Sequence, residues 1–229
     1  MALWEYLGAG SWTTKLLLHL NQNATDSSWN WNNWEPTNII WTWWMVWSWS
    51  ASFSWDGTIA INNKVINNSS FSISFWIKTW THWAWINTCI IDNTWFSWFN
   101  RWVIIWQFSW NLHKLYTRIM EWSNNFWNTL VSNTNIDDNI WHHIVYTYTN
   151  DTSTNWINLY IDWNLDNQKT AISSMWVATN NLYFWRSSDT AQYYFKWTKD
   201  EIIIELWKIW SATDAKKHYT YSKWLYWIL

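Results

Sequence analysis

The amino-acid sequence predicts an all-β fold: a two-sheet antiparallel β-sandwich with a short C-terminal helix. Short segments alternate apolar and polar residues, most clearly at residues 71–78 (FSISFWIK), and stretches rich in Asn, Ser and Asp separate them. Helical periodicity is absent until residues 211–214 (SATD), which resemble a capping box and predict a helix over residues 212–219. The 229 residues fit one large sandwich and show neither an internal repeat nor a linker. We therefore expect one domain over residues 1–229, with its core at about residues 15–220.

The expected strands follow one another at short intervals, as in sandwiches built from hairpins. Asp56 and Gly57 indicate the turn of a hairpin between residues 51–53 and 58–61. In residues 71–78 the period of two predicts one buried face, made of Phe71, Ile73, Phe75 and Ile77, and an opposite face with Ser72 and Ser74. Strands are expected at residues 15–20, 51–53, 58–61, 71–78, 103–108, 114–118, 129–132, 142–149, 157–162, 182–185 and 201–205.

The composition departs most from that of ordinary proteins in tryptophan and glycine, with 32 Trp and 3 Gly. Ordinary glycine usage of about 7% would give about 16 glycines in a chain of this length. An all-β fold needs glycine at its turns, because positive φ is costly for a residue with a Cβ atom. Trp31, Trp34 and Trp163 each follow Asn or Asp, where Asn-Gly or Asp-Gly turns are expected. A glycine-rich loop is likewise expected at the run Trp41, Trp43, Trp44, Trp47 and Trp49.

We interpret many of these tryptophans as glycines encoded by UGA, a codon that some bacterial lineages read as glycine. A translation that reads UGA as Trp prints Trp at each such position. Trp76, Trp141 and Trp210 lie in motifs where tryptophan belongs and are expected to be genuine. The alternative is a truly Trp-rich protein that uses its indoles as stacking platforms for sugars or bases.

Charge and cysteine content exclude several classes of protein. Fourteen Lys and Arg against sixteen Asp and Glu give a net charge of −2 with no basic stripe, so no nucleic-acid partner is expected. Cys89 is the only cysteine, so the chain can form neither an internal disulfide nor a cysteine zinc cluster. No signal-peptide pattern and no apolar run of about 18 residues is visible, so membrane insertion is not expected.

Five segments, taken in order, carry a family resemblance. Each is weak alone, but together they make the chain resemble the laminin G-like and concanavalin A-like lectin/glucanase superfamily. The resemblance implies a lectin-like jelly-roll sandwich. Most departures from the family pattern are Trp where the family has Gly, in agreement with the codon interpretation. The segments are residues 26–34 (DSSWNWNNW), 71–78 (FSISFWIK), 141–148 (WHHIVYTY), 159–165 (LYIDWNL) and 195–205 (FKWTKDEIIIE).

The acidic residues of the last segment do not predict catalysis. The glucanases of the superfamily carry three acidic side chains on one face of a strand. Here Glu201 and Glu205 share a face but lie four residues, or about 13 Å, apart, and Asp200 is expected on the other face. Retaining glycosidases need about 5–5.5 Å between carboxyl groups and inverting ones about 6.5–9.5 Å. We therefore expect no enzyme activity.

The resemblance implies a non-catalytic carbohydrate- or glycoconjugate-binding module of a secreted, surface or multi-domain protein. Its partner would be a glycan or glycoprotein, and its location extracellular or at the cell surface. The alternative is an adhesion or structural protein, such as a phage virion component, that binds a protein partner. A glycan array distinguishes the two.

The resemblance also implies a structural calcium ion. In sandwiches of this type calcium commonly joins the N-terminal segment to the last strand, and Asp26 and Asp200 are the residues expected to hold it. The alternative is equally open: Asp26 forms an Asx-turn and Asp200 caps the turn before its strand.

Sequence reasoning does not identify the carbohydrate site. His142 and His143 are adjacent, so they face opposite sides of their strand and are expected to be structural rather than ligands of one metal. Trp76 and Trp141 lie in regularly alternating strands, which indicates core packing rather than sugar stacking. Plausible polar or aromatic contacts are Tyr116, Arg118 and Arg186.

Overall fold

The computed structural model describes residues 13–20, 26–28, 30, 32, 34–45, 48–61, 65–66, 69–80, 88–94, 101–108, 111–119, 129–150, 156–170, 182–184 and 198–228. These residues form thirteen strands and one helix, and every paired strand is antiparallel. The elements are β1 (Thr14–Leu18), β2 (Trp34–Met45), β3 (Ser48–Ile61), β4 (Phe71–Trp80), β5 (Thr88–Thr94), β6 (Arg101–Phe108), β7 (Asn111–Ile119), β8 (Thr129–Val131), β9 (Asp138–Tyr148), β10 (Trp156–Ile161), β11 (Asn164–Thr170), β12 (Leu182–Phe184), β13 (Thr198–Leu206) and α2 (Ala212–Ile228).

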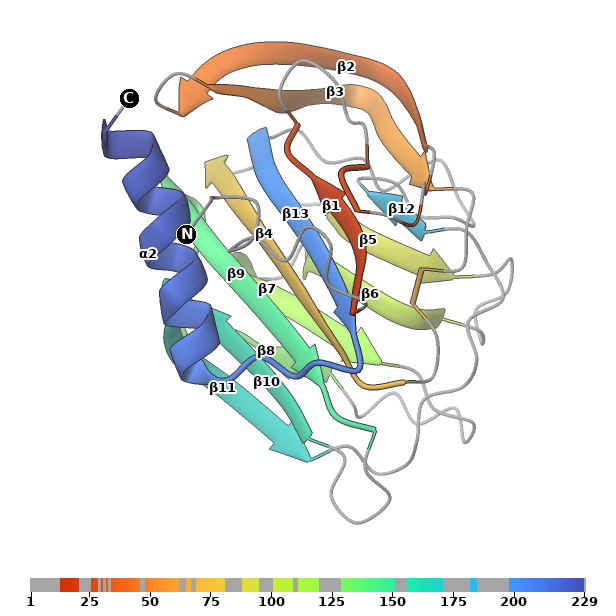
Figure 1. Cartoon of the computed structure of the whole chain (residues 1–229), viewed down its shortest axis with the longest axis vertical. Helices are drawn as coiled ribbons and strands as arrows, with labels where there is room; N and C mark the ends of the chain where they lie inside the picture. The colour runs from red at the N-terminus through yellow and green to blue at the C-terminus, as the bar shows by residue number, and fades with distance from the viewer. Residues whose placement is uncertain are drawn as a thin grey trace.

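The strands form two layers, and the predicted antiparallel sandwich is confirmed (Figure 1). The helix-side sheet consists of β1, β13, β4, β9, β10 and β11, and α2 lies across its outer face. The far sheet consists of β12, β5, β6, β7 and β8. The β2–β3 hairpin closes the top of the molecule in this view and joins the two sheets, since β3 pairs with both β13 and β12.

Strand β3 runs through Asp56 and Gly57 without a hairpin turn, so the hairpin expected there is wrong. Ala51 and Ser52 pair with β13 of the helix-side sheet, whereas residues 59–61 pair with β12 of the far sheet. Between these regions the pairing with β2 shifts at Thr37/Ile39, so that four residues of β3 lie opposite one residue of β2 in a bulge. Strands that pass from one sheet to another do so at such bulges or bends, and a glycine suits them.

The tryptophan run from Trp41 to Trp49 is not the expected loop either. Trp41, Trp43 and Trp44 belong to β2 and Trp49 belongs to β3, while Trp47 lies outside the described residues. Ile39 and Trp41 pack against the core, two residues apart on one face of β2. The segment is therefore a strand with one core-facing side.

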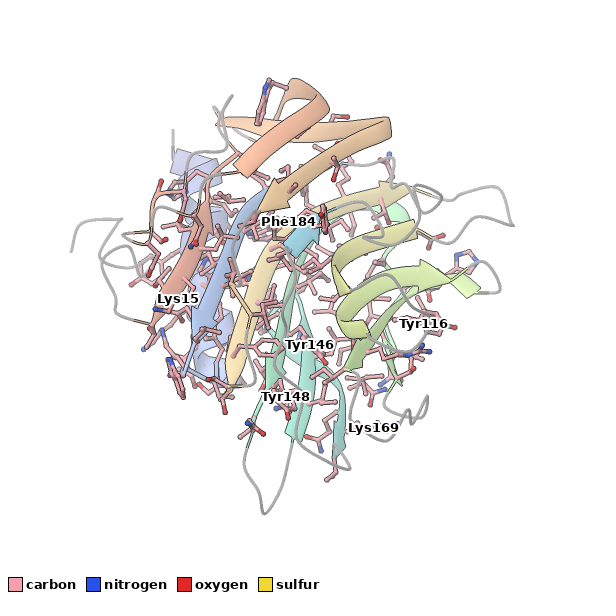
Figure 2. The ribbon with its side chains drawn as sticks, turned by 90° about the vertical axis from the view of Figure 1, so that its right-hand side faces the viewer. Lys15, Tyr116, Tyr146, Tyr148, Lys169 and Phe184 are labelled. Carbon is pink, nitrogen blue, oxygen red and sulfur yellow. The ribbon has the colours of Figure 1, made fainter. Side chains whose placement is uncertain are left out.

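The core lies between the two sheets, and the predicted alternation of residues 71–78 is confirmed. All four apolar side chains of that segment, from Phe71 to Ile77, are fully buried in it. Figure 2 shows Tyr146 and Tyr148 of β9 and Phe184 of β12 inside the sandwich, whereas Tyr116 of β7 lies at its periphery.

Ser72 and Ser74 lie on the opposite face of β4 as predicted, but they are also buried, because a second layer covers them. Ser72 Oγ donates to the carbonyl of Lys208 at 2.8 Å and accepts from the amide of Trp210 at 2.9 Å. The segment before α2 and the helix itself form this layer. Strand β4 is thus buried on both faces, not half-buried.

The capping box at the start of α2 is confirmed. The amide of Asp214 donates to Ser211 Oγ at 3.2 Å, and the amide of Ser211 donates to Asp214 Oδ2 at 2.9 Å. The helix extends to Ile228, nine residues beyond the predicted end. Neither proline nor glycine occurs between Tyr219 and Ile228, so nothing local stops it.

Two tryptophans have the backbone conformation of glycine. Asp162 and Trp163, the two residues between β10 and β11, have φ of 49° and 64°, as in a type I′ turn, which favours Asp-Gly. Trp207 has φ of 66° and is 68% exposed. Trp34 begins β2, as expected for a strand end. Trp31 lies outside the described residues, as do Trp185 and Trp197, two further positions at which the family pattern leads us to expect glycine.

The substitution Trp207→Gly should raise the free energy of unfolding by about 1 kcal/mol, because positive φ costs a residue with a Cβ atom about that much more than glycine. Trp76→Gly is the matched control and should lower it by about 3–5 kcal/mol, because Trp76 is 3% exposed. Urea denaturation measures both. A large loss at Trp207 would contradict the interpretation, as would UGG codons or a natural protein whose intact mass includes an indole at these positions.

Candidate functional site

Asp26 is a hydrogen-bond centre that ties the N-terminal polar loop to β1. Its Oδ1 accepts from the amides of Leu17 (3.1 Å) and Ser28 (2.8 Å). Its Oδ2 accepts from Ser28 Oγ (2.7 Å) and from the amide of Asn32 (2.9 Å). The bond to the amide two residues ahead is that of an Asx-turn. Four donors use the four lone-pair positions of the carboxylate.

Asp200 is fully buried at an irregular point of β13. It pairs with Trp76, while Ile203 pairs with Ser74, so a register shift lies between them, and Glu201 has φ of 48°. Since Trp76 and Ser74 share a face of β4, Asp200 and Ile203 share a face as well. The expectation that Asp200 lies on the face opposite Glu205 is therefore wrong, because a bulge interrupts the alternation.

Strand β1 separates the two aspartates. Leu18 of β1 pairs with Ile202 of β13 on one side and bridges to Asp26 on the other. Within the described residues, no group of three or more His, Cys, Asp or Glu side chains is arranged to hold a metal ion. That Asp26 and Asp200 bind one calcium ion stays a prediction.

If calcium binds these carboxylates, Ca²⁺ should raise the melting temperature of the protein relative to EDTA, because a ligand of the native state stabilises it. Asp26→Ala should abolish this difference. The same substitution should lower the free energy of unfolding by about 2–4 kcal/mol even in EDTA, because it leaves several amide donors unpaired. Equal melting temperatures of the unsubstituted protein with Ca²⁺ and with EDTA would contradict calcium binding.

Glu201 and Glu205 have structural partners. His19 Nδ1 lies 3.0 Å from both carboxylate oxygens of Glu201. Glu205 is 1% exposed, forms an ion pair with Lys208 at 2.9 Å and accepts a hydrogen bond from Trp210 Nε1. Each carboxylate is held by neighbours of its own, and nothing in the arrangement brings the two together across a substrate.

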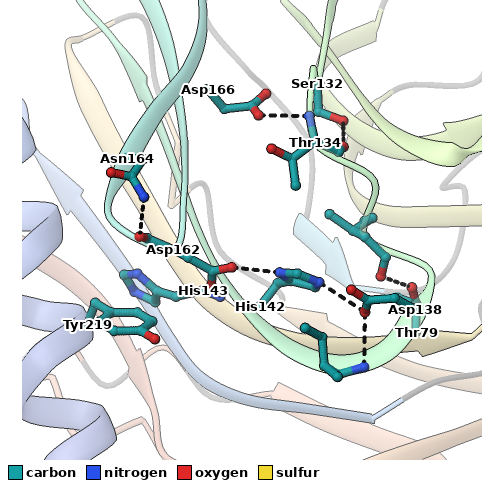
Figure 3. Close-up of polar contacts among 12 residues, drawn as sticks. Thr79, Ser132, Thr134, Asp138, His142, His143, Asp162, Asn164, Asp166 and Tyr219 are labelled. Carbon is teal, nitrogen blue, oxygen red and sulfur yellow. Dashed lines mark hydrogen bonds and ion pairs between the residues drawn. The ribbon is translucent and has the colours of Figure 1, made fainter.

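His142 joins three parts of one end of the sandwich (Figure 3). Its Nδ1 lies 2.8 Å from Asp162 Oδ2, in the β10–β11 turn, and its Nε2 lies 3.1 Å from Asp138 Oδ1, at the start of β9. The amide of His143 donates to Asp162 Oδ1 at 3.0 Å. Burial opposes the charged ring, but the hydrogen bonds and charges of Asp162 and Asp138 raise the pKa of His142. The structural role of this histidine follows from its two carboxylate partners.

His142→Gln should lower the free energy of unfolding by about 2 kcal/mol at pH 6, because it removes a buried ring that forms charge-assisted hydrogen bonds with two partly exposed carboxylates. The raised pKa means that this contribution is complete below the ordinary histidine pKa and is lost as the pH rises through the raised value, so the effect should shrink at pH 9. His113→Gln is the control: His113 contacts Asp137 at 2.6 Å, but its side chain is 54% exposed. A loss below about 1 kcal/mol for His142→Gln would contradict the assignment.

Trp76 packs in the layer beneath α2, as expected of a core residue. Its Nε1 donates to Ser222 Oγ at 3.0 Å, and its ring stacks on that of Tyr219 with centroids 5.3 Å apart. Trp141 belongs to the same cluster and is half-buried. Neither indole lies on an open ligand surface.

The outer face of the far sheet carries two of the three residues that the sequence suggested as contacts. In β7, Leu115 and Thr117 are fully buried, so Lys114, Tyr116 and Arg118 stand on the opposite face, each half-buried. Burial raises the pKa of the Tyr116 phenol, which therefore stays protonated and can donate a hydrogen bond. The third residue, Arg186, lies outside the described part of the chain.

A second aromatic side chain stands on the same face in β12. Tyr183 is half-buried between the fully buried Leu182 and Phe184. Arg118 lies three strands away, or about 14 Å, and its Nε donates to Thr129 Oγ1 at 3.0 Å. The register of the strands places five residues in one row across the sheet: Tyr183, Asp92, Ile104, Arg118 and Thr129. The members of this row follow from the order of the strands in the sheet, which sequence periodicity does not supply.

The two sheets differ in how their outer faces are covered. Helix α2 covers the helix-side sheet (Figure 1), whereas no described element lies over the outer face of the far sheet. In the described part of the chain, no helix combines the length and the apolar character needed to cross a membrane. The far sheet is therefore the candidate ligand surface.

Two of the similar solved structures are binding domains. The binding domain of Paraclostridial Mosquitocidal Protein 1 is 17% identical, with a TM-score of 0.72 over 90% of this chain and 52% of that one. The botulinum neurotoxin type G receptor-binding domain is 14% identical, with a TM-score of 0.66 over 92% of this chain and 51% of that one. The chain thus spans about half the length of these toxin domains.

A third similar structure corresponds to the chain over nearly its whole length. Domain 4 of an extracellular arabinanase from Geobacillus stearothermophilus, solved with arabinotriose, is 14% identical, with a TM-score of 0.66 over 89% of this chain and 97% of that one. A comparison with curated proteins finds no match. The profile of the concanavalin A-like lectin/glucanases superfamily matches residues 53–204, which is more than half of the chain. The chain belongs to the concanavalin A-like lectin/glucanases superfamily.

Proposed function

We propose that this chain is a non-catalytic carbohydrate- or glycoconjugate-binding module of a secreted, surface or multi-domain protein, and that it works outside the cell or at its surface. The observation that carries the proposal is the row of Lys114, Tyr116 and Arg118 on the outer face of β7. That face belongs to the sheet that no described element covers.

The chemistry of this row suits a sugar. A tyrosine ring offers an apolar face for the C–H groups of a pyranose or furanose, and its hydroxyl offers a polar edge. The lysine and arginine on either side are donors for sugar hydroxyl oxygens. The three side chains occupy alternate positions of one strand, so each lies about 7 Å from the next. One short glycan could contact all of them.

The similar structures support binding over catalysis but do not fix the ligand, since one fold serves many ligands. The arabinanase domain was solved with arabinotriose, the domain of Paraclostridial Mosquitocidal Protein 1 is a binding domain, and that of the botulinum neurotoxin is a receptor-binding domain. Glu201 and Glu205, the two glutamates of the last strand, are held by structural partners, which supports a non-catalytic module.

A glycan array followed by calorimetry tests the proposal. Tyr116→Ala should weaken binding of the best glycan at least tenfold, the loss of about 1.4 kcal/mol expected for an aromatic anchor. Tyr116→Phe should retain most of the affinity, because the ring remains. Tyr221→Ala, at a 47% exposed tyrosine on α2, is the matched control and should leave affinity unchanged.

Three outcomes would contradict the proposal. If no glycan binds and a protein partner is recovered instead, the adhesion or structural alternative holds. Sensitivity to Tyr221→Ala with none to Tyr116→Ala would place the site on the helix. Hydrolysis of a bound glycan would show an enzyme.

A further inference from the structure

A buried pair of histidines lies between α2 and the helix-side sheet. His143 of β9 is 0% exposed and His218 of α2 is 3% exposed. His143 Nε2 lies 2.9 Å from His218 Nδ1. Ser74 Oγ of β4 lies 2.8 Å from the first of these nitrogens and 3.4 Å from the second. We call these two rings the histidine pair.

The geometry of the histidine pair does not allow both rings to be charged at the same time. A hydrogen bond between two ring nitrogens needs one donor and one acceptor, so the facing nitrogens cannot both carry protons. The remaining nitrogens, His143 Nδ1 and His218 Nε2, are buried and have no hydrogen-bond partner within the described structure. A second proton on either ring would therefore bury a charge together with an unpaired N–H group.

No carboxylate of the described residues forms a hydrogen bond or ion pair with either ring. On the β13 side, Glu205 is already engaged by Lys208 and Trp210. The buried Asp200 stands on the same face of that strand, next to Trp76 and two strands away from His143. Asp214, at the start of α2, is held by Ser211. The other titratable neighbours, Tyr219 of α2 and Tyr160 of β10, are phenols. Among the described residues, neither ring has an acidic group within hydrogen-bonding distance.

The surroundings lower the pKa of both rings. Burial, with a smaller effect of the neighbouring ring, lowers the pKa of His143 well below its ordinary value. Burial and the positive charge of Lys208 lower the pKa of His218 to about 3. In the detached helix, His218 would return towards the ordinary value of about 6.5.

The described side chains that hold α2 are small or polar. Ala215, His218 and Ser222 face the sheet at helical spacing. Ring contacts join Tyr219 to Trp76 and His218 to Trp210, two of the tryptophans that are expected to be genuine. None of the three residues on this stripe is a large aliphatic side chain. Among the described side chains, the histidine pair thus lies at the centre of the contact between the helix and the sheet.

We propose that α2 is an acid-released cover of the helix-side sheet: protonation of the histidine pair detaches the helix and exposes the sheet face beneath it. That face carries Trp76, Val145, Tyr160 and Ile203, which are buried when the helix is docked. Release thus converts a polar helical surface into an aromatic and apolar one. This inference does not depend on the glycan site of the far sheet.

The sign and range of the effect follow from proton linkage. Because the docked state lowers the pKa of both histidines, it binds fewer protons than the detached state. Docking is therefore complete above about pH 6.5 and is lost as the pH falls towards the lowered values. In that range, each fall of one pH unit shifts the equilibrium from docked towards detached α2 by up to tenfold for every proton taken up.

Hydrogen exchange of the α2 amides tests the proposal. After correction for intrinsic exchange rates, protection of residues 212–228 should fall at least tenfold between pH 7 and pH 5, while protection of the β4 and β9 amides stays unchanged. His143→Gln/His218→Gln should flatten this dependence, because the amide side chains do not titrate. His113→Gln, at an exposed histidine, should leave it as it is.

A second measurement covers the case in which the double substitution prevents docking at neutral pH. In the unsubstituted protein, the ring resonances of His143 and His218 should show protonation at the pH at which α2 loses protection. Three results would overturn the proposal: α2 protection that does not change with pH, an unchanged slope in the folded double variant, or simultaneous unfolding of β4 and β9 with the helix.

Discussion

The structure depends on strands that are buried on both faces. Strand β4 packs Phe71 and Ile73 into the core between the sheets, while Ser72 and Ser74 face the layer formed by α2 and the segment before it. Polar groups buried in this way need hydrogen-bond partners, and the covering layer supplies them. The cover in turn excludes ligands from the helix-side sheet when the helix is docked. Among the described elements, none covers the outer face of the far sheet, which is why the proposed binding site is placed there.

Sequence reasoning succeeded where local pattern decides structure. The alternation in β4, the capping box of Ser211 and Asp214 and the opposite faces of His142 and His143 each depend on residues close in sequence. It missed β2, where a glycine-rich loop was expected, β5 (TCIIDNT) and β11 (NLDNQKT). Strand β11 is polar except for Leu165 and mostly exposed at the edge of its sheet, so no apolar period marks it.

The failures share a physical cause, which is tertiary pairing. Asp56 and Gly57 have the composition of a hairpin turn, yet β3 has partners in both sheets and continues through them with a bulge. Asp200 lies on an unexpected face because a bulge at Glu201 interrupts the period of two. The row from Tyr183 to Arg118 needs the order of strands far apart in sequence, and a single sequence does not contain that order in readable form. In all three cases, strands that are distant in the sequence decide the local structure.

The adjacent histidines of β9 show how one short motif can serve two opposite electrostatic functions. His142 points to the end of the core, where Asp138 and Asp162 favour its charged form and raise its pKa, so its contribution to stability falls as the pH rises. His143 points to α2, where His218 and aromatic rings favour its neutral form, so its contribution falls as the pH decreases. The period of two places these side chains in different environments one residue apart. We therefore expect a substitution of His142 to change the pH response of the end of the sandwich, and a substitution of His143 to change that of the helix.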